Sequence, residues 1–531
     1  MRNEFHLFTL LTILLTGLGA WFLHPAWAWL YALWLPVIGL GFYDLSQKPH
    51  AIVRNFPVLG RLRYMAEWMR PKVLQYFVET DTEGRPFSRI NRSIIYQRAK
   101  KAIDTTPFGT QLDVYEEGYE WMAHSIAALD HKNLEHHPRV MVGGKDCKKP
   151  YALSVMNVSA MSFGSLSKNA VLALNGAAKL GHFAHNTGEG GISPYHLAPG
   201  GDLIYQVGTG YFGCRAADGG FDADVFADTA APEQVRMIEL KLSQGAKPGH
   251  GGILPANKNT PEIAAIRKVP AGIQVDSPPF HRAFQTPIGL LELLATMRER
   301  SGGKPVGFKL CIGNKYEFIA ICKAMLQTGI VPDFITVDGG EGGTGAAPLE
   351  FSNYVGMPFR EGLAFVHDTL TGFDLRKDIR VLASGKIASG FDIFRAHALG
   401  ADACNSARAM MMALGCIQAL ECNTNTCPTG VATQNPELVR GLVVEDKQTR
   451  VANYQKNTVN SFVELMAAAG VHTPAEIKRN MIQRRITMNM VRRYDEIFPP
   501  LSPGCLLQAE TYPADYAALM KMAKAEQWQL A

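Results

Sequence analysis

Three cysteines lie within twelve residues of one another, in the pattern Cys416-x5-Cys422-x4-Cys427. The segment around them is rich in Asn, Thr, Gly and Pro, which indicates a loop rather than the buried core where single cysteines usually lie. Structural zinc normally takes four protein ligands, and no fourth Cys or His lies close in sequence. Three thiolates therefore favour an iron–sulfur cluster. A fourth ligand from Cys404 or Cys214 remains an alternative.

Two lysines and an amide form a second group, Lys241-x2-Gln244 followed by Lys247 in a glycine-rich segment. The spacing predicts that Lys241 and Gln244 lie one helical turn apart, with Lys247 where the chain leaves the helix. Solvated surface lysines are the alternative, but the many glycines favour a site. Cations that converge on one pocket would suit a dicarboxylate substrate and the negative charge of a reduced flavin.

Two later turns have the composition of a phosphate site. They are Ser384-Gly385-Lys386 and Asn405-Ser406-Ala407-Arg408. Backbone N–H groups at such turns bind phosphate, and Lys386 and Arg408 would add charge-assisted contacts. Each turn alone could be an ordinary connection. Their joint position after the last two expected strands predicts a phosphorylated cofactor.

The elements that must position these residues are short apolar runs that alternate with helical patterns from Tyr151 to about Gly430. Eight strands alternating with helices over roughly 250 residues predict an α/β fold, a (β/α)8 TIM barrel. An open doubly wound sheet is the alternative, but no GxGxxG follows a first strand. The expected strands are Leu153–Val158, His182–His185, Ile204–Val207, Gly272–Val275, Val306–Leu310, Phe334–Val337, Val381–Ala383 and Ala401–Asn405. The expected helices include Lys168–Leu180, Pro287–Arg300, Tyr316–Gln327, Gly390–Leu399 and Ala407–Leu414.

The segments SFGSLS, NTGEGG, QVGTGYFG, QGAKPGHGG, DGGEGGTGAAP and GC-x5-C-x4-CPTGVATQ occur in this order between Val155 and Gln434. Together they resemble the FMN-binding synthase domain of glutamate synthase. The resemblance implies a barrel that holds FMN, with a [3Fe–4S] cluster on Cys416, Cys422 and Cys427. It also implies that 2-oxoglutarate and ammonia condense to 2-iminoglutarate, which the reduced flavin converts to L-glutamate.

The resemblance also assigns roles to single residues. It implies catalytic roles for Lys247, Glu189 and Gln244, and contacts to substrate for Lys241, Gln244 and Arg267. Together with the expected strand ends, it gives as candidate cofactor-binding residues Ser162, Gly164, Lys309, Gly340, Gly343, Gly385, Lys386, Ala407 and Arg408.

The chain departs from that pattern at three positions near the expected pocket. Tyr211 stands where the family has Arg, and His250 and Ile253 replace polar residues of the segment KPGEGGQLP. These changes predict a less basic pocket that prefers a 2-oxo acid or imine with one carboxylate over 2-oxoglutarate. We also expect no glutamine hydrolysis, because the sequence has no N-terminal cysteine nucleophile.

The first 43 residues contain two uncharged apolar runs, Phe5–Leu23 and Ala26–Tyr43. Each is close to the ~20 residues that cross a bilayer, and basic residues follow over 48–72. We therefore expect a transmembrane helical hairpin in the inner (cytoplasmic) membrane, with the catalytic body facing the cytoplasm. A signal peptide cleaved after Ala28 and a buried helical hairpin are the alternatives.

Composition sets the remaining limits. Hydrophobic residues make up 47% of the chain, which excludes disorder as the main state, and a net charge of +5 does not indicate nucleic acid binding. We expect a hairpin (1–43), a linker and packing segment (44–150), the barrel (151–435) and a C-terminal helical segment (436–531). Helical patterns are expected at Tyr64–Val78 and Glu116–Leu129.

The favoured function is an imine or 2-oxo acid reductase that takes electrons from a separate protein, either a ferredoxin-like carrier or a reductase. One alternative is an FMN dehydrogenase that passes electrons from an amino or hydroxy acid to a membrane acceptor. A non-catalytic redox subunit is the other alternative.

Overall fold

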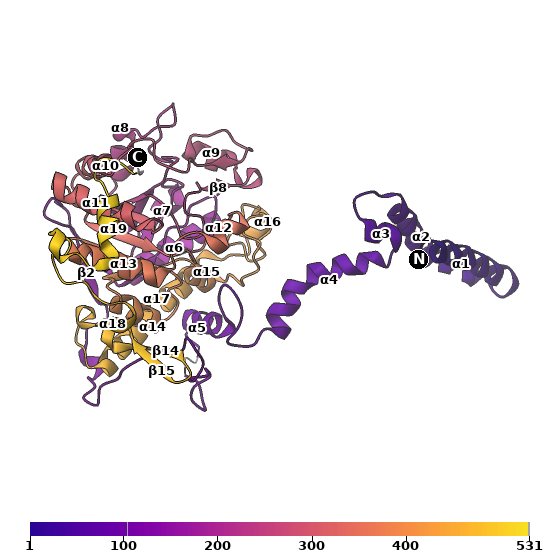
Figure 1. Cartoon of the computed structure of the whole chain (residues 1–531). Helices are drawn as coiled ribbons and strands as arrows, with labels where there is room; N and C mark the ends of the chain where they lie inside the picture. Colours follow the sequence, from indigo (N-terminus) through magenta and orange to yellow (C-terminus); the bar gives the residue numbers. More distant parts are fainter. Residues whose placement is uncertain (103–104, 529–531) are drawn as a thin grey trace. The chain divides into compact units, whose positions relative to one another are not determined.

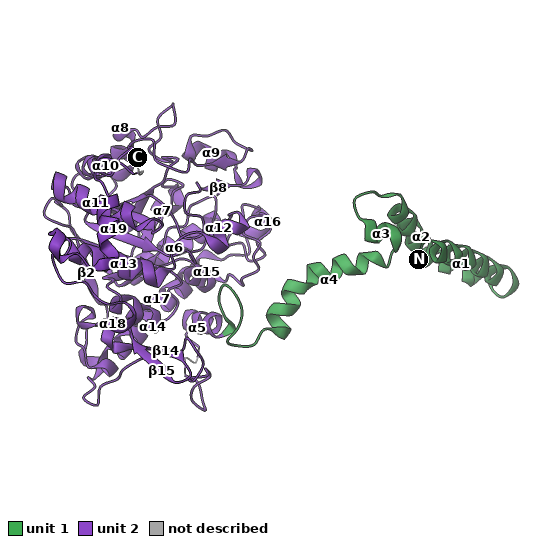
Figure 2. Ribbon diagram, viewed as in Figure 1, with its two compact units in different colours: residues 1–89 green, residues 90–531 purple. Residues whose placement is uncertain are grey.

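The computed structural model describes residues 1–102 and 105–528. The chain forms two compact units, residues 1–89 and 90–531, which Figure 2 colours separately. Each is described by itself.

The second unit is built on a closed barrel of parallel strands (Figure 1). Each strand pairs with the next barrel strand along the chain, and β13 pairs with β4. The strands are β4 (Met156–Val158), β5 (His185–Asn186), β6 (Leu203–Val207), β7 (Val235–Lys241), β10 (Val306–Cys311), β11 (Phe334–Asp338), β12 (Arg380–Ser384) and β13 (Ala403–Ser406). The predicted TIM barrel is confirmed.

The helices between these strands begin where the sequence supplies caps. Ser167 accepts the Ala170 N–H at the start of α6, and Thr286 with Pro287 starts α10. All five helices predicted within the barrel form, with ends within two residues of those expected. The helices that follow barrel strands are α6 (Lys168–Gly181), α7 (Pro194–Leu197), α8 (Ala223–Ala230), α9 (Pro261–Arg267), α10 (Pro287–Arg300), α11 (Lys315–Thr328), α12 (Leu349–Tyr354), α13 (Phe359–Gly372), α14 (Gly390–Ala398) and α15 (Arg408–Leu414).

The prediction for the fourth strand was wrong. The barrel strand is β7 (Val235–Lys241), whereas the expected Gly272–Val275 contributes only Val275 to a two-residue pairing of β8 (Ile253–Leu254) with β9 (Val275–Asp276). Lys241 is consequently the last residue of a strand and does not lie on a helix. The pattern misled because β7 carries the charged residues Glu239 and Lys241, which are buried yet paired.

One further strand prediction was wrong in part, and one helix prediction was wrong. The expected strand Leu153–Val158 is two strands: β4 belongs to the barrel, while β3 (Tyr151–Ser154) pairs with β2 (Arg139–Val142). The expected helix Glu116–Leu129 is instead irregular apart from β1 (Glu120–Met122). Its Glu120 is held by Arg395 at 2.8 Å and by the Tyr494 hydroxyl at 2.8 Å, contacts from distant segments that no local pattern reveals.

The C-terminal segment is helical only in part, because β1 continues into a sheet with β14 (Ile482–Thr487) and β15 (Met490–Arg493). The helices outside the barrel in this unit are α5 (Arg89–Lys100), α16 (Pro436–Val439), α17 (Val444–Ala469), α18 (Tyr494–Ile497) and α19 (Ala514–Met522). Short 3-10 turns are η3 (His131–Asn133), η4 (Ala256–Lys258), η5 (Pro474–Glu476), η6 (Arg479–Met481) and η7 (Ala509–Thr511).

A fully buried apolar cluster joins the barrel strands to the β2–β3 hairpin. Val142 and Leu153 of the hairpin pack with Ile204, Phe334 and Leu382 of the barrel. The hairpin thereby adds apolar contacts to the barrel core, and the functional residues lie at the carboxyl ends of the strands.

The first unit contains α1 (Arg2–Phe22), the 3-10 helix η1 (Pro25–Trp29), α2 (Leu30–Ser46), α3 (Ala51–Asn55), α4 (Gly60–Val73) and a π-helical turn η2 (Leu74–Val78). In the hairpin, Gly41 leaves space for the Phe5 ring and Gly19 for Trp27. The segments Arg2–Phe22 and Pro25–Ser46 are long and apolar enough to cross a membrane, with mean hydropathies of 1.7 and 1.4.

Candidate active site

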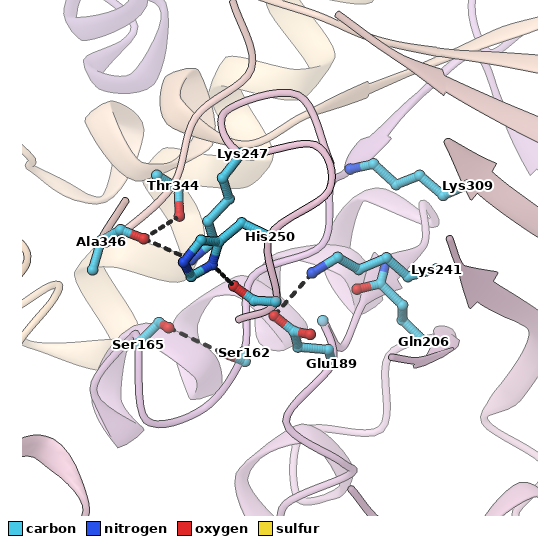
Figure 3. A network of polar contacts seen from close by, with 12 residues as sticks. Ser162, Ser165, Glu189, Gln206, Lys241, Lys247, His250, Lys309, Thr344 and Ala346 are labelled. Atoms are coloured by element: carbon cyan, nitrogen blue, oxygen red, sulfur yellow. Dashed lines mark hydrogen bonds and ion pairs between the residues drawn. The ribbon is translucent and has the colours of Figure 1, made fainter. Parts of the chain in front are cut away.

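A carboxylate and a lysine pair where two barrel strands end. Glu189 lies in the loop after β5, and its Oε1 is 2.9 Å from the Nζ of Lys241 at the end of β7 (Figure 3). Two glycines make room for the carboxylate: a Cβ on Gly208 would lie 2.7 Å from Glu189 Oε2, and one on Gly252 would lie 2.4 Å from Oε1. Larger residues at these positions would displace the carboxylate.

Three cations act on Glu189. Burial alone would raise the pKa of its carboxyl, but Lys241, Lys247 and Arg267 outweigh burial and lower it. Glu189 is therefore ionised at neutral pH, with positive charge in excess around it.

Lys247 lies in the loop after β7. Its Nζ donates to the Ala346 carbonyl at 2.6 Å, in the loop after β11 (Figure 3). Burial lowers the pKa of the Lys247 ammonium to about 8, although Glu189 opposes this shift. An ammonium with a pKa near neutrality can release a proton during a reaction.

Arg267, the last residue of α9, reaches the first strand loop. It donates to the Phe163 carbonyl at 3.1 Å, and its guanidinium carbon lies 5.0 Å from the centre of the Phe212 ring. Burial lowers the pKa of Arg267 to about 10, so the side chain stays charged. Its buried Nε has no hydrogen-bond partner among the described residues. An N–H without an acceptor here suits an anionic ligand.

Lys241 has a lysine neighbour across the barrel sheet. Lys309 on β10 is its register partner, and Lys309 Nζ lies 3.0 Å from Asp338 Oδ2 at the end of β11. Burial would lower the pKa of Lys309, but Asp338 and Glu239 outweigh it and raise the pKa. The adjacent strands β7 and β10 thus place Lys241 and Lys309 side by side. Lys241 pairs with Glu189, and Lys309 pairs with Asp338.

Below these pairs lies a polar layer that sequence reasoning missed. The fully buried Glu239 accepts from Asn186 Nδ2 at 2.8 Å and from Gln206 Nε2 at 2.7 Å, and Thr336 donates to its other oxygen. The signal was present as polar residues inside otherwise apolar strands. These residues form one layer because β7 is a barrel strand, which places Glu239 beside the neighbouring strands.

The backbone of Lys241 is supported by a relay that includes Tyr211. The Tyr211 hydroxyl accepts the Ala283 N–H at 3.1 Å and lies 3.1 Å from His281 Nδ1, while His281 Nε2 lies 2.8 Å from the Lys241 carbonyl. Burial lowers the pKa of His281 to about 4, so the ring is neutral. Tyr211 therefore helps to position Lys241. This role was not expected for a residue that stands where the family has Arg.

The other substitutions lie nearer the lysines. His250 Nδ1 lies 2.9 Å from the Gly251 carbonyl, and the His250 ring packs edge-on against Phe351 with centroids 5.3 Å apart. Ile253 begins β8 and is half-buried. Gln244 is half-buried in the loop that contains Lys247, and because Lys241 ends a strand, the two residues are not one helical turn apart as predicted.

The expected phosphate turns follow β12 and β13 as predicted. Lys386 adopts φ +48° directly after Gly385, and a Cβ on Gly385 would lie 2.6 Å from the Phe359 ring. Arg408 donates to the Glu341 carbonyl at 2.7 Å and packs against Gly343, where a Cβ would lie 2.8 Å from Arg408 Cδ. These close contacts explain why positions 385 and 343 are glycines, since a larger side chain would clash with Phe359 or Arg408. They also join the turn containing Ala407 to the loop that contains Gly340 and Gly343.

Near the first strand loop, Ser162 Oγ donates to Ser165 Oγ at 3.0 Å (Figure 3). Gly164 has φ +101°, and a Cβ on it would lie 3.1 Å from Arg267 Nη2. The predicted residues Ser162 and Gly164 therefore lie beside Arg267. Their roles toward a cofactor stay predictions.

The cysteine loop is strained and polar. Gln418, Leu420 and Asn425 have positive φ angles of 58°, 60° and 66°. Burial, with Cys422 and Cys427 nearby, raises the pKa of Cys416 to about 12. Burial also acts to raise the pKa of Cys427, but the Thr429 hydroxyl and backbone N–H groups outweigh it and lower the pKa.

Hydrogen bonds to sulfur are typical of cluster-binding thiolates, so this donor set suits an iron–sulfur cluster. Within residues 1–102 and 105–528, however, no group of three or more His, Cys, Asp or Glu is already arranged to hold a metal ion. Cys404 lies inside β13. Cys214 lies beside the Tyr205 hydroxyl; burial raises the pKa of Cys214 to about 12, although the hydrogen bond from Tyr205 acts to lower it.

Comparison with known proteins gives one consistent result. Residues 97–472 match the family described as the conserved region in glutamate synthase. The glutamate synthase large subunit-like protein YerD of Bacillus subtilis is 38% identical over 482 residues, which cover 83% of this chain and 91% of YerD. The archaeal glutamate synthase [NADPH] of Methanocaldococcus jannaschii is 38% identical over 325 residues, which cover 61% of this chain and 60% of that protein.

Proposed function

The chain belongs to the glutamate synthase family, and on that premise we propose that it is an FMN- and iron–sulfur-dependent oxidoreductase. Its substrate would be an imine or 2-oxo acid with a carboxylate, reduced to the amino acid. Relatives named glutamate synthase [NADPH] support an oxidoreductase of this kind.

The observation that carries the proposal is the excess of positive charge around one carboxylate. Lys241 at the end of β7, Lys247 in the loop after it and Arg267 at the end of α9 all act on Glu189. A buried site with more cations than anions favours an anionic ligand, and a substrate carboxylate would supply the missing charge.

FMN would bind with its phosphate at the turns after β12 and β13, near Gly385, Lys386 and Arg408. The close-packed glycines and the half-buried guanidinium of Arg408 support this position. When bound and reduced by the external donor, FMN would supply the hydride for the substrate carbon.

The chain's own residues would bind the substrate carboxylate and protonate the imine nitrogen. Lys241 and Arg267 would hold the substrate carboxylate, because one is an ammonium at a strand end and the other has a buried N–H without a partner. Reduction of a C=N bond adds hydride to carbon and one proton to nitrogen. Lys247, with a pKa of about 8, would donate that proton.

Electrons would come from a separate ferredoxin-like or reductase protein and pass through a [3Fe–4S] cluster on Cys416, Cys422 and Cys427. The hydrogen bonds to Cys427 sulfur support cluster binding there. Residues 1–43 would insert in the inner membrane, with the catalytic body in the cytoplasm. The length and hydropathy of the two N-terminal helices support membrane insertion, and the basic residues over 48–72 support the cytoplasmic orientation.

The test is flavin reoxidation by the purified, reduced protein with free ammonia and a panel of 2-oxo acids. We expect reoxidation by an acid with one carboxylate and a less charged tail to exceed that by 2-oxoglutarate, and none with glutamine in place of ammonia. A protein that purifies colourless and takes up no FMN would contradict the proposal. A clear preference for 2-oxoglutarate would contradict only the substrate part.

A membrane-linked dehydrogenase is the second candidate, favoured by the two helices long enough to cross a bilayer. In that case amino or hydroxy acids would reduce the flavin, and the membrane-inserted protein would reduce quinone analogues. Quinone reduction that is lost on deletion of residues 1–43, with no reoxidation by imines, would establish this function instead.

A further inference from the structure

Helix α4 (Gly60–Val73) carries an uncovered apolar face. Four of its large apolar residues recur at intervals of three or four, which places them on one side of the helix, whereas the exposed Tyr64 and Trp68 lie on another side. The four are Leu62, Met65, Met69 and Val73, with exposed fractions of 55%, 52%, 41% and 40%. A contiguous apolar face of this kind marks an interaction surface rather than scattered surface residues.

Basic side chains border this face on both sides. Arg63 and Arg70, seven residues apart, follow one edge, and Arg61 and Lys72 follow the other. Glu67 is the one acidic residue of the helix. Long basic side chains beside an apolar face can extend to headgroup phosphates while their stems cover the acyl region.

An ion pair between the buried Asp44 and the partly exposed Arg61 fixes where α4 begins. The Asp44 carboxylate, near the end of α2, accepts from Arg61 Nη2 at 2.6 Å and from the Val58 N–H at 2.9 Å. Val58 is held at φ +63°, an unfavourable conformation for a β-branched residue that the Asp44 contact stabilises. The start of α4 is thus joined to the end of the second apolar helix.

We propose that α4 lies on the surface of an anionic lipid bilayer, with Leu62, Met65, Met69 and Val73 in the interface. The inference rests on the membrane insertion proposed above for α1 and α2, because the Asp44–Arg61 pair then holds α4 at headgroup level. It does not depend on the reaction. The basic borders favour lipid phosphates over a neutral apolar partner.

The test is oxidative footprinting of the full-length protein in lipid nanodiscs. Met65 and Met69 report on the face, and Met488, 74% exposed in the second unit, is the internal control. In discs of phosphatidylcholine with phosphatidylglycerol, we expect Met65 and Met69 to oxidise several-fold more slowly than Met488. The triple variant Arg63→Gln, Arg70→Gln, Lys72→Gln should restore fast oxidation of both.

A matched variant removes the same charge elsewhere: Arg440→Gln, Arg492→Gln, Arg493→Gln should leave the protection intact. Oxidation of Met65 and Met69 as fast as Met488 in anionic discs overturns the proposal. So does protection that is equal in pure phosphatidylcholine discs and unaffected by the triple variant, because protein then covers the face. Entry into discs is scored separately by co-elution, so failure of the hairpin is distinguished from failure of α4.

Discussion

Lys258 joins the cysteine loop, through the Cys422 carbonyl, to the loop that follows the first barrel strand. Its Nζ donates to the Cys422 carbonyl at 3.2 Å, and the same ammonium donates to the carbonyls of Ser165 at 2.7 Å and Ala432 at 3.1 Å. One buried side chain therefore links the expected cluster loop with the loop that contacts Arg267.

Replacing Lys258 by Met should damage both loops at once. Three backbone carbonyls, one buried and two partly buried, would lose their donor, at a cost of about 1–3 kcal/mol for each that stays unsatisfied. Loss of a cation near an anionic cluster should also make its reduction potential more negative. Thermal unfolding and redox titration measure the two effects. Lys268→Met, which removes an exposed lysine with one carbonyl partner, is the control and should change neither.

The proposed proton-donor role of Lys247 predicts that activity falls on the alkaline side of the pH profile. Burial lowers its pKa to about 8, so the ammonium is present below that pH and lost above it. Imine reduction should therefore fall as pH rises through 8, approaching about tenfold per unit. Lys247→Arg keeps the charge at these pH values, so its residual activity should lack this fall. A fall that persists near pH 8 in that variant would assign the proton to another group.

Arg408→Ala should lower flavin occupancy. If Arg408 contacts the cofactor phosphate, the loss of a charge-assisted hydrogen bond of about 1.5–3 kcal/mol weakens FMN binding roughly 10- to 100-fold. Absorbance of the purified protein and FMN titration of the apoprotein measure this. Arg440→Ala, at an exposed arginine paired with Glu437, should bind FMN normally. Equal FMN affinities would remove Arg408 from the site.

Replacing Cys416, Cys422 or Cys427 by Ser should abolish the cluster. Iron content and the electron paramagnetic resonance signal of the oxidised protein should both disappear, since each thiolate would bind one of three irons. Cys505→Ser, outside this loop, should retain both. Stoichiometric zinc in the parent protein, or no metal at all, would contradict the cluster assignment.

The sequence predicted the barrel and most of the helices because these depend on local periodicity and caps, as at Ser167 and Thr286. It failed at β7, where Glu239 and Lys241 gain their partners only from other strands. It also could not show that Tyr211 contacts His281, because that contact joins residues 70 positions apart. The motif residues Glu189, Lys241, Lys247 and Arg267 were identified by resemblance. Their mutual electrostatic effects could be known only from the fold.

The pairing of Lys241 with Glu189 has a consequence for binding. The protein's own carboxylate already occupies the ammonium that a substrate carboxylate would use, so Glu189 acts as an internal competitor. Substrate must displace it or share the lysine, and part of the binding free energy is spent on that exchange. A substrate that binds too weakly to displace Glu189 would leave Lys241 paired with Glu189. In this way a single side chain can set a minimum affinity for any anion that cannot share the lysine.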